Sequence, residues 1–112
     1  MDTSTEFCVM LTSVDSETAA QALASALVDA RLAACVQVLP MSSFYVWQGA
    51  SRRDAEYLLL AKTRTALWAA LEHFIHTRHP YELPELLQLP VTAGSAAYLK
   101  WLRENTPAPP QE

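Results

Sequence analysis

Glycine and cysteine are both scarce in this chain. Gly49 and Gly94 are its only glycines, and a phosphate-cradling loop needs several glycines close together, so nucleotide sites of that type are excluded. Cys8 and Cys35 lie too far apart in the sequence for a disulfide framework or a zinc knuckle. This use of cysteine is typical of a reduced compartment, and we expect a cytoplasmic protein.

Long apolar runs and an excess of positive charge are also missing. The longest apolar stretches, such as residues 57–61, fall far short of the ~20 residues that a membrane-spanning helix needs. Eight Lys and Arg against twelve Asp and Glu leave a formal net charge of −4, which disfavours nucleic-acid and anionic-membrane surfaces. The polar, acidic start lacks the features of a secretory signal. We therefore expect no nucleic-acid partner and no membrane partner.

The chain does have enough apolar residues for a core. They make up 51% of its 112 residues, against 18% charged residues, a composition too apolar for a disordered segment. This length has room for one domain. We place that domain at residues 7–105, between a flexible N-terminus at 1–6 and a proline-rich C-terminal tail at 106–112.

Four segments have the apolar, β-branched or aromatic composition of strands. The third has the continuous apolar run of a central strand, and prolines bracket the fourth, which favours an edge position. We expect the polar residues 50–54 to form a turn that leads into the third strand. The predicted strands are 7–11, 35–39 with a resumption at 44–47 after Pro40, 56–62, and 86–89.

Three helices are expected between and after these strands. The first follows the first strand and extends to Arg31, with apolar residues at helical spacing. Thr65 is the predicted cap of the second, which must end before His79 because Pro80 disfavours helical backbone at the preceding residue. The third begins at Ser95 and carries apolar residues on one face, namely Tyr98, Leu99 and Leu102.

This order of elements predicts an α+β fold of the ferredoxin-like split βαβ type, βαββαβ with an added C-terminal helix. Two helices would cover one face of the sheet. Apolar side chains alternate on both faces of the third strand, so the opposite face also needs a cover, which points to oligomerisation. The alternative is a sheet that leaves a polar face in water.

The segment from His79 to Glu85 is the most unusual string in the chain. Two prolines stiffen it, and it carries an imidazole, a phenol and two carboxylates. Such a loop can present ligands to a cation or to a polar molecule. It can equally be a rigid connector whose polar groups cap backbone atoms, and the residues alone leave both interpretations open. His73 and His76 fall on the solvated face of the preceding helix and are not expected to bind metal.

Other candidates for chemistry are weaker. Cys35 enters an apolar strand, where a thiol is more often packing than a soft metal ligand or nucleophile. Lys62 ends a central strand and could bind an anion, although a lysine there is ordinarily solvated. No Ser-His-Asp or paired-carboxylate arrangement stands out by spacing. We therefore assign no catalytic residues and expect no enzyme activity.

Five motifs nevertheless occur together in a fixed order, and together they resemble the CutA family of divalent-cation tolerance proteins. The resemblance covers about residues 7–105, nearly the whole predicted domain. The motifs are Arg31-Leu32-Ala33-Ala34-Cys35-Val36, Tyr45-Val46-Trp47-Gln48-Gly49, Lys62-Thr63, the segment His79 to Glu85, and Tyr98-Leu99-Lys100-Trp101-Leu102.

The resemblance implies a ferredoxin-like subunit in a tight homotrimer, with the architecture of PII signalling proteins. It also implies a role in tolerance to copper and other divalent metals, with no established reaction. The positions it assigns to clefts between subunits are Cys35, Trp47, Lys62 and Tyr81, with His79, Glu82 and Glu85 as metal ligands. Some members carry a Cys where this chain has Thr12 and a second His where it has Arg78, so His79 is the only match to that ligand set.

We therefore predict a homotrimer that binds Cu²⁺ or another divalent cation and needs no organic cofactor. One alternative is a PII-like sensor that binds a small anion at the cleft between subunits through Lys62. The other is a structural trimer whose partner is another protein.

Overall fold

A computed structural model describes residues 6–107, so the predicted flexible N-terminus and proline-rich tail fall largely outside the described residues. The chain forms one four-stranded sheet in the order β2-β3-β1-β4, with antiparallel pairing throughout. This arrangement confirms the α+β, ferredoxin-like prediction. The elements in chain order are β1 (Phe7–Val14), α1 (Glu17–Asp29), β2 (Cys35–Trp47), β3 (Ala50–Arg64), the 3₁₀ turn η2 (Thr65–Leu67), α2 (Trp68–Arg78), β4 (Leu87–Pro90) and α3 (Ala96–Glu104).

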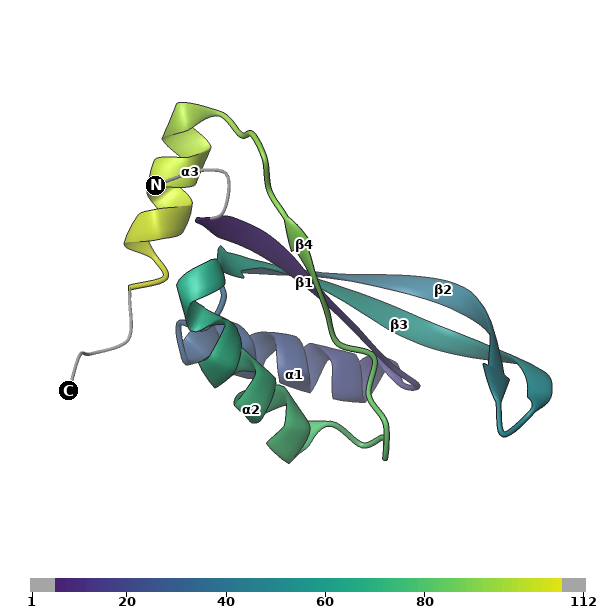
Figure 1. Ribbon diagram of the computed structural model, residues 1–112. Helices are drawn as coiled ribbons and strands as arrows, with labels where there is room; N and C mark the ends of the chain where they lie inside the picture. The colour runs from purple at the N-terminus through teal and green to yellow at the C-terminus, as the bar shows by residue number, and fades with distance from the viewer. Residues whose placement is uncertain (1–5, 108–112) are drawn as a thin grey trace.

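Helices α1 and α2 lie together on one side of the sheet (Figure 1). Alternate residues of β1 and β3 point toward them and are fully buried, as are the apolar residues of both helices that face the sheet. This two-layer packing supplies most of the apolar burial that stabilises the subunit. The core contains Met10, Val14, Leu23, Leu27, Leu59, Ala61, Leu71 and Ile75.

The β2–β3 hairpin is longer than the sequence analysis predicted. Strand β2 is continuous from Cys35 to Trp47, so its division into 35–39 and 44–47 was wrong. Residues 50–54 belong to β3 and not to a turn. The turn needs only Gln48 and Gly49, both at positive φ, as in the two-residue turns that suit hairpin twist. Pro40 interrupts nothing because β2 is an edge strand, where a missing N–H is tolerated.

The outer half of this hairpin projects beyond the rest of the sheet (Figure 1). Strands β2 and β3 pair over their full length, from Cys35↔Lys62 to Trp47↔Ala50. Strand β1 pairs with β3 only as far as Val14↔Tyr57. The hairpin therefore continues as a two-stranded ribbon with exposed apolar residues, including Phe44 and Val46.

The ends of the helices follow local side-chain chemistry. Ser16 and Ser95 cap α1 and α3, and their hydroxyls accept hydrogen bonds from backbone N–H groups in the first turn. The prediction that Thr65 caps the second helix was wrong: its N–H donates to the Glu6 carbonyl, and it begins the 3₁₀ turn that precedes α2. The predicted stop is confirmed, because His79 is extended (ψ 136°) directly after α2.

The sheet face opposite α1 and α2 is largely uncovered and apolar, as predicted. Leu39, Leu87 and Leu89 alternate with the core residues of their strands and are 48%, 54% and 47% exposed. Helix α3 reaches only the end of the sheet where β1 begins (Figure 1), where the Arg103 guanidinium pairs with the Glu6 carboxylate at 2.7 Å. Among residues 6–107, no helix is long and apolar enough to cross a membrane.

Candidate functional site

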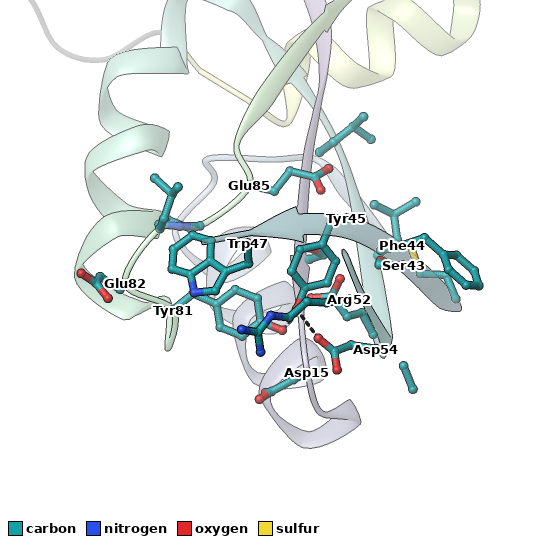
Figure 2. A pocket seen from close by; sticks show the side chains of 18 residues that line it. Asp15, Ser43, Phe44, Tyr45, Trp47, Arg52, Asp54, Tyr81, Glu82 and Glu85 are labelled. Atoms are coloured by element: carbon teal, nitrogen blue, oxygen red, sulfur yellow. Dashed lines mark hydrogen bonds between the residues drawn. The ribbon is translucent and has the colours of Figure 1, made fainter. Parts of the chain in front are cut away.

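An open pocket of about 1180 Å³ lies on this uncovered side, where the projecting hairpin passes the loop after α2. Three parts of the chain build it: the end of β1, the outer half of the β2–β3 hairpin, and residues 81–85 (Figure 2). Alternation along β2 and β3 explains the hairpin's share, because every second residue faces the same side of a strand. The polar and aromatic lining residues are Ser13, Asp15, Ser43, Phe44, Tyr45, Trp47, Arg52, Asp54, Glu56, Tyr81, Glu82 and Glu85.

The lining is strongly acidic. Five carboxylates face one guanidinium, that of Arg52, so four negative charges have no positive partner among the pocket residues. Such a concentration of one sign inside a concave surface raises the local concentration of counter-ions. The pocket is therefore built to attract cations and to repel anions.

A buried carboxylate forms part of the pocket wall. Glu56 is only 8% exposed, and the Tyr81 hydroxyl donates to its Oε2 at 2.6 Å. Burial, and then this carboxylate, raise the pKa of the Tyr81 phenol well above its usual range, so the phenol stays protonated and acts as a donor. The bond ties the loop after α2 to the hairpin.

A second tyrosine–carboxylate pair lies farther out on the hairpin. The Tyr45 hydroxyl donates to Oδ2 of Asp54 across the two strands (Figure 2). This hydrogen bond, with a smaller effect of burial, raises the pKa of Tyr45. The pocket thus holds two phenols that each orient a carboxylate.

His79 lies beside the pocket and holds its loop in place. Its Nε2 is 2.7 Å from the Ser13 carbonyl oxygen, and its Nδ1 accepts the Tyr81 backbone N–H at 3.1 Å. A carbonyl can only accept, so Nε2 carries a hydrogen. Nδ1 accepts a hydrogen bond and therefore carries none, so the ring is neutral. Burial lowers the pKa of His79, against a smaller opposing effect of the Ser13 bond. Both ring nitrogens are therefore engaged within this chain.

The structure separates the predicted site residues into two groups. Trp47, Tyr81, Glu82 and Glu85 line the pocket, with His79 adjacent to it. The other two cleft residues, Cys35 and Lys62, are register partners at the opposite end of the β2–β3 ladder. There the Lys62 ammonium lies 5.7 Å from the centre of the Tyr98 ring, and Cys35 is a partly buried free thiol.

In the described part of the chain, no three His, Cys, Asp or Glu side chains gather closely enough to hold a metal ion. The assignment of His79, Glu82 and Glu85 as metal ligands stays a prediction. Arg78 stands where some family members carry a second His, and its guanidinium carbon lies 3.7 Å from the centre of the Phe74 ring. It lines a smaller groove beside α1.

Sequence reasoning missed several pocket residues. Asp54 and Glu56 were assigned to a turn and to the start of a strand, although their spacing of two places them on one face of β3. Tyr45 sits two residues before Trp47 and shares its face for the same reason. Asp15 had no such signal, because its place depends on where β1 ends relative to the hairpin.

Comparison with known proteins gives a consistent result. Residues 8–105 match the family model described as CutA1 divalent ion tolerance protein. The chain is 48% identical over 99 residues to the divalent-cation tolerance protein CutA of Thermus thermophilus, covering 88% of this chain and 96% of that protein. It is 42% identical over 92 residues to human protein CutA, covering 81% of this chain and 51% of that protein, so it spans about half of the human relative.

Solved structures agree with these matches. CutA from Synechococcus elongatus superposes with a TM-score of 0.89 at 42% identity, covering 96% of this chain and 95% of that one. Cut A1 from Thermus thermophilus superposes with a TM-score of 0.87 at 46% identity, covering 90% and 99%. The chain therefore belongs to the CutA1 family of divalent ion tolerance proteins.

Proposed function

We propose that this protein contributes to divalent-cation tolerance by binding divalent cations in the acidic pocket, as a homotrimer and without catalysing a reaction. The observation that carries the proposal is the charge of the pocket, where five carboxylates face a single guanidinium. Carboxylate oxygens bind hard divalent ions such as Mg²⁺, Ca²⁺ and Mn²⁺. An imidazole nitrogen also suits Cu²⁺ and Zn²⁺.

Glu82 and Glu85 are the ligands we propose at the pocket mouth, because both are exposed and line it. His79 can join them only by giving up the hydrogen bond that its Nδ1 accepts from Tyr81. Its lowered pKa keeps the ring neutral, which is the form that binds metal. We expect Cu²⁺ to be preferred, following the Irving–Williams order, and to bind weakly because the imidazole must first be released.

The homotrimer is supported by the uncovered face of the sheet. Leu39, Leu87 and Leu89 expose about half of their surface there, next to the pocket. Exposed apolar patches of this kind mark protein–protein contacts. The family resemblance implies a trimer with its clefts between subunits. We therefore propose that a second copy of the chain covers this face.

The pocket argues against the anion-sensor alternative. Its negative charge repels anions, and Lys62, the residue that alternative depends on, does not line it. An anion site would have to form elsewhere on the open face, near Lys62 and Cys35.

Calorimetric titration of tag-free protein with CuCl₂ tests the metal proposal. We expect Glu82→Gln/Glu85→Gln to weaken binding at least tenfold. The matched control Glu72→Gln/Glu104→Gln alters two exposed helix carboxylates away from the pocket and should leave the affinity within a factor of two. The proposal fails if the two double variants behave alike, since the ion would then respond to net charge and not to the pocket.

His79→Ala is compared with His73→Ala/His76→Ala in the same titration. We expect the first to weaken Cu²⁺ binding and the second, on the exposed face of α2, to change it little. The opposite pattern would place the ion on the helix surface.

A further inference from the structure

The smaller groove lies on the helical side of the molecule, beside α1. Its volume is about 380 Å³, and we call it the α1 groove. Three alanines and Leu23 line it from α1, Val14 from the end of β1, and Arg78 and Pro80 from the end of α2 and the loop that follows. Helices α1 and α2 lie on the side of the sheet opposite to the uncovered face (Figure 1). An assembly formed through that face therefore leaves the α1 groove open.

The α1 groove combines buried apolar residues with an exposed rim. Val14 and Leu23 are buried and belong to the core, whereas Ala22 and Pro80 are exposed. Apart from Arg78, every lining side chain is a hydrocarbon. The backbone N–H and C=O groups of α1 are engaged within the helix itself. A molecule in the α1 groove therefore meets apolar surface and few hydrogen-bond partners.

Arg78 supplies the one charge among the lining residues. Its guanidinium carbon lies 3.7 Å from the centre of the Phe74 ring, and its Nη1 donates to Oγ1 of Thr77 at 3.2 Å. These two contacts restrict the side chain before any ligand arrives. Among residues 6–107, no carboxylate is found in a salt bridge with Arg78. Because a guanidinium binds a carboxylate through two parallel N–H groups, Arg78 can hold one beside the apolar surface.

Charge and polarity together select the class of ligand. The α1 groove contains one guanidinium and no carboxylate, the reverse of the acidic pocket, so it is complementary to an anion. A peptide would bring N–H and C=O groups that hydrocarbon side chains cannot satisfy, at a cost in binding free energy. An alkyl chain brings none. The volume lies within the range of about 300–1,000 Å³ that is typical of small-molecule sites.

We infer that the α1 groove binds a medium-chain alkyl carboxylate, with the carboxylate on the Arg78 guanidinium and the alkyl chain against Val14 and Leu23. The groove shares no lining residue with the acidic pocket. Its ligand is therefore independent of the metal proposal, and failure of either one leaves the other standing.

Titration of the assembled, tag-free, ¹⁵N-labelled protein with sodium octanoate, below its micelle concentration and without metal, tests this inference by NMR. We expect saturable shifts of the amide resonances of residues 19–26. Ala22→Leu extends a side chain at the rim and should weaken binding at least tenfold. The matched control Ala70→Leu adds the same side chain to an exposed position of α2 outside the groove and should leave the affinity within a factor of two.

The role of the charge is tested in the same titration. Arg78→Gln should weaken octanoate binding at least fivefold, and Lys100→Gln, which removes an exposed charge from α3, should leave it within a factor of two. Octan-1-ol has the alkyl chain without the carboxylate and should bind at least fivefold more weakly than octanoate. Acetate has the carboxylate without the chain and should cause no saturable shift.

Three outcomes would overturn the inference. The first is octanoate shifts that do not saturate or that fall outside the α1 groove. The second is unchanged octanoate binding in Ala22→Leu or in Arg78→Gln. The third is tighter binding of the tripeptide acetyl-Ala-Ala-Leu, which ends in a free carboxylate, because the occupant would then be a peptide segment and not an alkyl carboxylate.

Discussion

The two halves of the β2–β3 hairpin have the same backbone pairing but opposite surroundings. The inner half lies over α1 and α2, and its residues Leu59 and Ala61 are fully buried. The outer half extends beyond β1, where Phe44 and Val46 are 74% and 71% exposed. Regular strand pairing alone therefore does not determine whether a segment is buried in the core or exposed. The inner half stabilises the subunit, and the outer half is left free to form the pocket and to meet other molecules.

Assembly should show the largest effect. Light scattering at micromolar concentration should give three times the 12.4 kDa mass of the chain. Leu89→Glu places a charge on the uncovered sheet face and should shift the mass to that of the monomer, because a carboxylate buried in an apolar contact has no partner. Val46→Glu, on the face of the hairpin opposite to Tyr45 and Trp47, is the control and should keep the trimer. A wild-type monomer would remove the assembly proposal.

Core truncation should come next in size. Leu59→Ala removes a fully buried side chain under α1 and α2 and should lower the free energy of unfolding by about 2–5 kcal/mol. Phe44→Ala, in the exposed outer half, should stay within about 0.5 kcal/mol. Urea denaturation measures both. Equal losses would mean that the outer half is as much a part of the folded core as the inner half.

The two tyrosine–carboxylate pairs offer a finer comparison. Tyr81→Phe leaves the buried Glu56 carboxylate without its donor and should cost about 1–3 kcal/mol of unfolding free energy. Tyr45→Phe breaks the exposed pair with Asp54, where water replaces the lost donor, and should cost under about 1 kcal/mol. If Glu56→Gln is added to Tyr81→Phe, part of the first loss should be recovered, since no uncompensated charge then remains. An equal cost for the two tyrosine variants would contradict the burial argument.

The smallest effect concerns pH. Burial holds the pKa of His79 below its ordinary value of 6.5, so the unfolded chain takes up a proton before the folded one does. The contribution of His79 to stability is therefore fully present above about pH 6.5 and is lost as the pH falls through the lower folded pKa. His79→Gln should reduce this loss between pH 6.5 and pH 5 in urea titrations. His73→Gln, on the exposed face of α2, should leave the pH dependence as in the wild type.

The sequence contained most of the fold and part of the pocket. Apolar spacing located the core strands and helices, and Pro80 located the end of α2, because both signals act between near neighbours. The continuous strand through Pro40 was hidden, since an edge position tolerates proline but is itself set by the sheet order. The resemblance supplied Trp47, Tyr81, Glu82 and Glu85, which the structure brings to one pocket.

The rest of the pocket depends on contacts between distant parts of the chain. Glu56 becomes a buried wall residue only because Tyr81, from the loop after α2, lies against it. His79 is engaged by Ser13 at the end of β1, 66 positions earlier in the chain. Local spacing in the sequence indicates neither partner, so the sequence predicts His79 as a free ligand. In the fold, both of its ring nitrogens form hydrogen bonds.

Anomalous X-ray scattering from crystals soaked in Cu²⁺ tests the central claim most directly, because it locates the ion. The account predicts a copper peak inside the acidic pocket, within ligand distance of the Glu82 or Glu85 carboxylate. A peak at His73 or His76 on α2, with none in the pocket, would contradict it.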